Sequence, residues 1–137
     1  MADDAVTRYC EASIANDIDR LLETLAPDIE VVSPLSGRLV FRGHDDVGVL
    51  LAGVYRTLRD WRWGNQVGNG DERVVIGRGR IAGLPLDDAM LFELGTDGRI
   101  RRIRPHLRPW LGTTAFALIL GCKLARYPSI IQRALSG

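Results

Sequence analysis

The sequence predicts one α+β domain that spans residues 1–137. Apolar residues recur at helical spacing near the start and near the end of the chain, and strand-like alternation fills the region between them. The composition, with 46% hydrophobic and 26% charged residues, is typical of a folded globular protein. No repeat, linker or low-complexity segment divides the chain, so helices and strands are expected to share one layered structure.

Two helices are expected before the first strand. The break between them falls at Asn16–Asp17, where Asp17 is suited to cap the second helix. Pro27 is expected to end that helix, because proline disfavours helical backbone in the residue before it. The apolar or small residues that carry the helical spacing are Val6, Tyr9, Cys10, Ser13, Ile18, Leu21, Leu22 and Leu25.

A hairpin and a third helix are expected next. Ile29 and Val31 alternate with more polar neighbours, as in a half-buried strand, and a turn at 34–37 leads into a second strand over 38–43. A helix then begins near His44, where the acidic residues 45–46 suit its positive end. Its apolar stripe consists of Val47, Leu50, Leu51, Val54 and Leu58.

Four further strands and a helical tail complete the prediction. Strands are expected over 60–68, 72–83, 88–95 and 100–109, with a turn at the sequence TDGR before the last of them. From Pro109 onward the apolar spacing is helical again until Pro128, so residues 110–137 are expected to form a C-terminal helical extension.

Composition also limits the classes of function. A net charge of +1 gives no general attraction to nucleic acid. The two cysteines, Cys10 and Cys122, lie far apart without a histidine nearby, so we expect no metal site or disulfide, and both are expected to be buried. No cofactor is indicated. The acidic start of the chain lacks an apolar leader, which favours a cytoplasmic protein.

Two stretches resemble the nuclear transport factor 2-like superfamily, in its ketosteroid isomerase and SnoaL-like branches. They read RYCEASIANDIDRLLETLAPDIEVVSPLSG and DAMLFELGTDGRIRRIRPHLRPW, and the resemblance spans roughly residues 4–110. It implies a curved antiparallel sheet that forms a cone around a pocket closed by the N-terminal helices. It also implies a homodimer. The tail would then be an extra C-terminal helix.

The same resemblance places the ketosteroid isomerase groups on this chain. The tyrosine that donates a hydrogen bond to the substrate corresponds to Tyr9 in the sequence RY. The catalytic aspartate that precedes proline corresponds to Ser33, and the second carboxylic acid corresponds to Met90. Serine needs a neighbouring base to take a proton, and methionine has no donor. The chain is therefore not expected to be a standard ketosteroid isomerase.

Alternation along the strand around Met90 makes Asp88 the best acid–base candidate in the sequence. Asp88 shares a face with Met90, Phe92 and Leu94, and a carboxylate at the end of an apolar stripe can acquire a raised pKa. The alternative is a solvated loop aspartate in the sequence PLDDA. Tyr9 is either an ordinary core tyrosine or a donor in the pocket.

The pocket wall is expected to include Ser33, Trp61, Trp63, Met90 and Phe92. Ser33 lies on the apolar face of its strand, although its position before proline suits a turn residue that bonds its own backbone. The two indoles share a face and would form a large flat wall, with at least one of them serving as core filler.

Basic residues of the last strand are expected to face outward. Arg102, Arg104, His106 and Arg108 share one face, which suits solvent or a homodimer contact better than RNA, since no exposed aromatic residues alternate with the arginines. His106 is a weaker candidate for a general base. His44 is expected to lie at the surface or to cap a helix.

Two functions and two positions of the tail stay open. The pocket binds a small apolar molecule, with cofactor-free proton transfer of an isomerase, cyclase or epoxide hydrolase, or it binds a ligand or protein without catalysis. The stripe of Phe116, Ile119, Leu120 and Leu124 is expected to pack over the pocket entrance. The alternative is a membrane-surface or partner-binding helix, with Lys123, Arg126 and Arg133 as its basic side.

Overall fold

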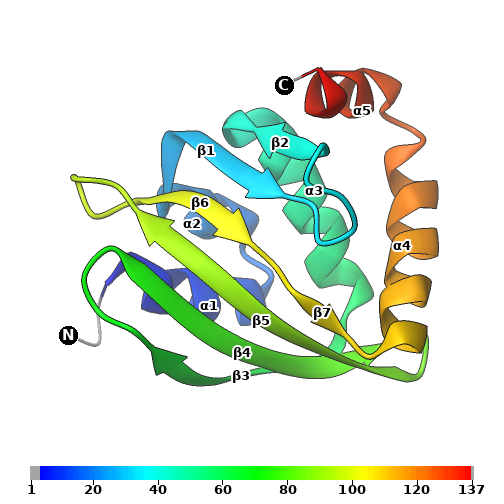
Figure 1. Ribbon diagram of the computed structural model, residues 1–137, viewed down its shortest axis with the longest axis horizontal. Coiled ribbons are helices and arrows are strands. Elements are labelled where there is room, and N and C mark those ends of the chain that lie inside the picture. The colour runs from blue at the N-terminus through cyan, green and yellow to red at the C-terminus, as the bar shows by residue number, and fades with distance from the viewer. Residues whose placement is uncertain (1–3, 137) are drawn as a thin grey trace.

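The computed structural model describes residues 4–136 and has the predicted α+β architecture. Helices at both ends of the chain flank a central run of strands that form one curved, open sheet (Figure 1). The elements are α1 (Ala5–Ala15), α2 (Ile18–Glu23), β1 (Leu25–Val32), β2 (Val40–Arg42), α3 (Gly43–Thr57), β3 (Arg59–Val67), β4 (Glu72–Ile81), β5 (Leu84–Leu94), β6 (Ile100–Arg104), β7 (Leu107–Arg108), α4 (Trp110–Leu124) and α5 (Pro128–Leu135).

The sheet has the strand order β2-β1-β6-β5-β4-β3, and β7 pairs with β5. Helices α1, α2 and α3 lie on one face of it, and α4 stands beside the end of β7 (Figure 1). The predicted antiparallel pairing holds except that β1 runs parallel to β6. The parallel pair is allowed because a long stretch of chain, including α3, separates the two strands.

The two predicted front helices are confirmed, but the role predicted for Pro27 is wrong. Asp17 caps α2 and accepts a hydrogen bond from the backbone of Arg20 at 3.2 Å. The helix already ends at Glu23, and pairing with β6 begins at Leu25. Pro27 lies inside β1, where the register against β6 shifts. Proline fits such an irregularity because it has no N–H to donate to the neighbouring strand.

Two strand boundaries differ from the prediction, and both changes affect the site. β5 begins at Leu84, four residues before the expected start at Asp88, so this aspartate lies within a strand and not in a loop. The predicted last strand is divided into β6 and β7. The division falls at Pro105, whose ring nitrogen cannot donate a hydrogen bond to a ladder.

The C-terminal segment folds back on the domain as two helices. α4 and α5 are bent by 116° at the break before Pro128. Ile130 and Ala134 of α5 are buried. Arg133 donates two hydrogen bonds to the Asp46 carboxylate of α3, at 2.9 and 2.8 Å. Arg133 therefore binds its own chain and does not belong to the free basic side that the sequence suggested.

Within residues 4–136, no one helix has both the length and the apolar composition needed to cross a membrane. α4 and α5 would reach that length and composition only when taken together, across their bend.

Two further expectations concerned a dimer contact through the arginines of β6 and the burial of the two cysteines. Arg102 forms an ion pair at 3.0 Å with Glu30 of its own chain, so it needs no partner across a dimer contact. The homodimer stays a prediction. The expectation that both cysteines are buried is wrong, because Cys122 is exposed and Cys10 is only partly buried.

We expect two leucines of α4 to differ sharply in their contribution to stability. Leu120 is 4% exposed and packs against the core, whereas Leu118 is 66% exposed. Leu120→Ala should lower the free energy of unfolding by roughly 2 kcal/mol, the low end for a buried leucine because a cavity already borders it. Leu118→Ala, the control, should change it by less than about 0.5 kcal/mol. Equal values in denaturant titrations would contradict the packing of α4.

Candidate active site

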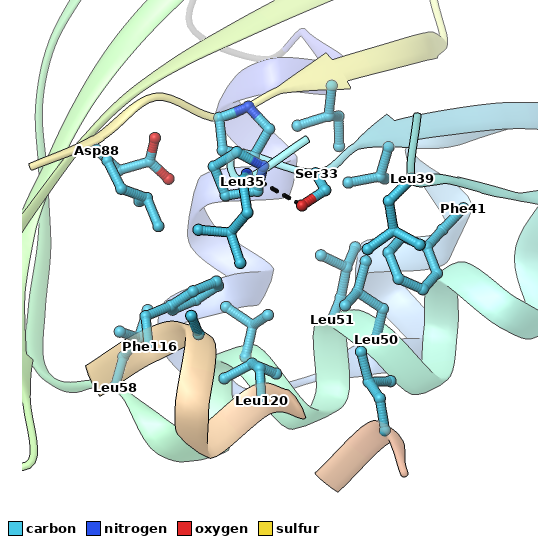
Figure 2. Close-up of a pocket in the computed structure, with 18 of the residues that line it drawn as sticks. Ser33, Leu35, Leu39, Phe41, Leu50, Leu51, Leu58, Asp88, Phe116 and Leu120 are labelled. Carbon is cyan, nitrogen blue, oxygen red and sulfur yellow. Dashed lines mark hydrogen bonds between the residues drawn. The ribbon is translucent and has the colours of Figure 1, made fainter. Parts of the chain in front are cut away.

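An apolar cavity of about 160 Å³ lies between the sheet and helices α3 and α4. Figure 2 shows side chains from β1, β2, β5, α3 and α4 converging on it. Most of its wall is hydrocarbon, including Phe41, Leu50, Leu51, Leu58, Phe116 and Leu120. The tail therefore forms part of the cavity wall, as the sequence led us to expect, while the N-terminal helices α1 and α2 contribute no residue to it.

Asp88 brings the carboxyl group to this wall. It is 4% exposed and follows the inward alternation of β5, between the buried Leu86 and Met90. Its Oδ1 accepts a hydrogen bond of 3.1 Å from the backbone N–H of His106. No hydrogen bond to its other oxygen is found within residues 4–136. Burial raises the pKa of Asp88 to about 7, although the His106 bond acts in the opposite direction.

The backbone of His106 is a part of the site that sequence reasoning missed. Residue 106 follows the interruption at Pro105, and its carbonyl accepts a hydrogen bond of 2.9 Å from Ala89 N–H. Its own N–H is thereby held over Asp88. The imidazole is exposed, with Nδ1 3.1 Å from the Ala89 carbonyl oxygen. Pro105 was the signal available in the sequence. A proline inside a predicted strand interrupts the pairing, so the backbone N–H of the next residue can bond a side chain instead of a neighbouring strand.

Ser33 lines the cavity and also stabilises a turn. Its Oγ accepts a hydrogen bond of 3.1 Å from the backbone N–H of Leu35, drawn as a dashed line in Figure 2. This is the turn interaction that the sequence suggested as an alternative to a substrate contact. A hydroxyl group that accepts one bond still has its own hydrogen to donate.

Tyr9 and Tyr55 form a buried pair of hydroxyl groups. Their oxygens are 2.7 Å apart, and either one can donate to the other. Tyr9 is completely buried behind the wall, whereas Tyr55 of α3 lines the cavity. Burial raises the pKa of both well above the usual value for tyrosine, with a further contribution from Asp88, so both stay protonated. Sequence reasoning missed Tyr55, although it lies four residues after Leu51 on the buried face of α3.

The two indoles occupy different places. Their rings are nearly perpendicular, at 88° with centroids 5.6 Å apart, so they do not form the expected flat wall. Trp61 lines the cavity, while Trp63 packs against Tyr9 and donates from Nε1 to Ser13 Oγ at 2.8 Å. A Cβ on Gly77 or Gly79 of β4 would collide with the Trp61 ring, so glycine is needed there.

The cavity thus brings together some of the predicted site residues and not others. Asp88, Ser33, Trp61 and Met90 line it. Tyr9, Trp63 and Phe92 pack behind the wall, where Tyr9 contacts both other rings edge to face. One group can accept or release a proton near neutral pH, and the tyrosine pair holds two hydroxyl hydrogens, of which only one is used between them.

Comparison with known proteins shows which family and which structures this fold resembles. Residues 6–103 match the family model of the SnoaL-like domain. An uncharacterised bacterial protein with a cystatin-like fold from Silicibacter pomeroyi DSS-3 is similar at a TM-score of 0.87 and 20% identity, covering 95% of this chain and 93% of that one. A steroid delta-isomerase from Pseudomonas aeruginosa is similar at a TM-score of 0.82 and 23% identity, covering 91% of this chain and 92% of that one.

A SnoaL-like protein of unknown function from Burkholderia thailandensis E264 is similar at a TM-score of 0.62 and 24% identity, covering 76% of this chain and 92% of that one. At these sequence identities, the similarity shows a shared fold but not a shared chemistry. No curated protein matches the sequence.

We expect stability to depend on pH through Asp88. The unfolded chain releases this proton near pH 4 and the folded protein near pH 7, so the folded state binds more protons in between. The stability from the protonated form is complete below about pH 4 and is lost as pH rises through about 7. At about 1.4 kcal/mol per tenfold change in proton affinity, the loss is roughly 4 kcal/mol at most.

Asp88→Asn should therefore be more stable than the wild type at pH 8, with the gain shrinking toward pH 4, in denaturant titrations across this range. Asp87→Asn controls for loss of a carboxylate from the same strand. An Asp88→Asn variant that is equally destabilised at every pH would contradict the buried, proton-binding carboxyl group.

Proposed function

Because the chain belongs to the SnoaL-like family of the nuclear transport factor 2-like superfamily, we propose that its cavity binds a small apolar molecule and that Asp88 exchanges a proton with it. The observation that carries this proposal is the carboxyl group in a hydrocarbon wall, with a pKa of about 7. A base of this pKa suits catalysis at neutral pH, because the ionised form is populated while its proton affinity stays high.

Proton transfer next to a carbonyl group also needs a donor for the oxygen that gains charge. In the proposal, the Tyr55 hydroxyl donates its one hydrogen to that oxygen, and Tyr9 positions Tyr55 by donating to it across 2.7 Å. The raised pKa of both tyrosines keeps the hydrogens in place. Ser33, whose Oγ already accepts a hydrogen bond from Leu35 N–H, also lines the cavity and is a second donor.

The volume limits the class of substrate. A dry apolar cavity of about 150 Å³ holds a benzene-sized molecule, and the cavity here measures about 160 Å³. A single six-membered ring fits this space, whereas a tetracyclic steroid would require α4 to move. The proposed substrates are therefore small, apolar carbonyl compounds with an acidic C–H bond.

Binding without catalysis is the second candidate, and one observation favours it. Of the two positions at which ketosteroid isomerases hold carboxyl groups, one has Ser33, engaged with a turn, and the other has Met90, which has no donor. A cavity used only for binding would need neither group. The two candidates differ in whether Asp88 turns a substrate over.

Cyclohex-3-enone is a suitable probe because it contains one ring. Asp88 would take the proton from the carbon between the carbonyl group and the double bond and return it at the far alkene carbon, giving cyclohex-2-enone. The appearance of the conjugated product, followed by ultraviolet absorbance, should accelerate with rising pH, with a midpoint near 7. Asp88→Asn should reduce the rate by about 100-fold or more.

Asp87→Asn, with the neighbouring carboxylate removed, is the control and should keep the wild-type rate. An Asp88→Asn variant that keeps that rate would contradict the proposal. A wild-type protein that is stabilised by the enone in a melting experiment, yet does not convert it, would support binding alone.

A β,γ-unsaturated ketosteroid should not be isomerised above the uncatalysed rate. Ser33 and Met90 occupy the positions that the resemblance assigns to the base and to the second carboxylic acid, so a steroid bound as in those isomerases would meet neither group there. The cavity of about 160 Å³ is also too small for four fused rings. Isomerase turnover with this substrate, absent from heat-denatured protein, would refute both arguments.

A further inference from the structure

The outward face of α4 carries no charged residue along its first three turns. Its exposed residues up to Cys122 are Trp110, Leu111, Leu118, Gly121 and Cys122. Trp110 is 77% exposed and Leu111 is 57% exposed. A helix at the surface of a globular protein usually presents polar and charged side chains to water, so this face fits an apolar or amphipathic partner better than solvent.

Three basic side chains lie beside this face. Arg56 of α3, together with Lys123 and Arg126 at the end of α4, lines a groove of about 770 Å³. Within residues 4–136 none of the three forms an ion pair, although Asp45 lines the same groove. Cys122 belongs both to the groove and to the exposed α4 face, so the two surfaces are continuous.

We propose that the exposed face of α4 and the basic groove together bind the surface of an anionic lipid bilayer. Leucine and tryptophan side chains on one side of a helix enter the headgroup boundary, while cations next to them attract anionic lipids. Each Lys or Arg close to such a surface strengthens binding about fivefold. The three cations of the groove supply the charge complementarity, and the uncharged helix face supplies the apolar contact.

A second copy of the chain fits this face less well. α4 has 15 residues and is about 22 Å long, and a helix is about 10 Å wide. One face of it therefore offers a few hundred Å², whereas a stable interface buries about 800 Å² on each partner.

Bilayer binding would place the cavity next to a source of apolar molecules. Phe116, Ala117 and Leu120 of α4 line the cavity on the side opposite to the exposed face. A single helix would then separate the lipid from the cavity. The inference about the bilayer is independent of proton transfer by Asp88, because it rests only on the outer surface of α4 and on the groove.

Co-sedimentation of the full chain with lipid vesicles tests the proposal. Vesicles of phosphatidylcholine with about one-third phosphatidylglycerol should bind the protein, and vesicles of phosphatidylcholine alone should bind it at least about fivefold more weakly. Leu118→Glu, in the apolar face, and Arg126→Glu, in the groove, should each weaken binding to the anionic vesicles at least about fivefold.

Two matched variants on β3 control for charge and surface changes elsewhere. Val67→Glu replaces an exposed apolar residue, at 62% exposure, and Arg62→Glu reverses an exposed cation. Both should bind the anionic vesicles like the wild type, and melting curves of all variants show whether they fold.

Absence of wild-type binding to anionic vesicles would overturn the proposal. So would a Leu118→Glu variant that binds normally, because attraction of headgroups without insertion of α4 would then explain the result. A wild-type dimer that Leu118→Glu converts to a monomer, with no vesicle binding, would assign the face to a second copy and would also overturn it.

Discussion

The free-energy cost of ionising Asp88 inside an apolar wall is the constraint on which the rest of the site depends. The alternation of β5 that buries Leu86 and Met90 also buries this carboxyl group. A single backbone N–H, from His106, compensates part of the lost hydration. The hydration that this bond does not replace raises the pKa of Asp88 to about 7. A residue that is ordinarily ionised therefore becomes a group that can change its protonation state at neutral pH.

The pKa of Asp88 stays raised only while water is kept out of the cavity. The helices α3 and α4 cover it with leucine and phenylalanine side chains. The position of the tail is fixed by burial of Ile130 and Ala134, and by the two hydrogen bonds from Arg133 to Asp46 of α3. The segment after the family match, which ends at residue 103, is therefore part of the apolar wall around Asp88. A shift of α4 would change the cavity volume and the pKa together.

Sequence periodicity was sufficient for the order of elements and for the inward direction of Asp88, because alternation in a strand is a local property. It could not show where β5 begins, since Gly83 and Pro85 are typical turn residues, yet Leu84 already pairs with Ile81. The Tyr9–Tyr55 contact joins residues 46 positions apart, so no local pattern contains it. The His106 donor depends on how β6 and β7 separate around Pro105, which is a consequence of the complete sheet.

An NMR titration of the Asp88 side-chain carboxyl carbon, with Asp88→Asn used to assign the resonance, measures directly whether this group changes its protonation state near neutral pH. We expect this carbon to titrate with a midpoint near pH 7, because burial in the apolar wall disfavours the charge. A midpoint near 4, the value for a solvated aspartate, would contradict a dry cavity around Asp88 and the proposed exchange of a proton at neutral pH.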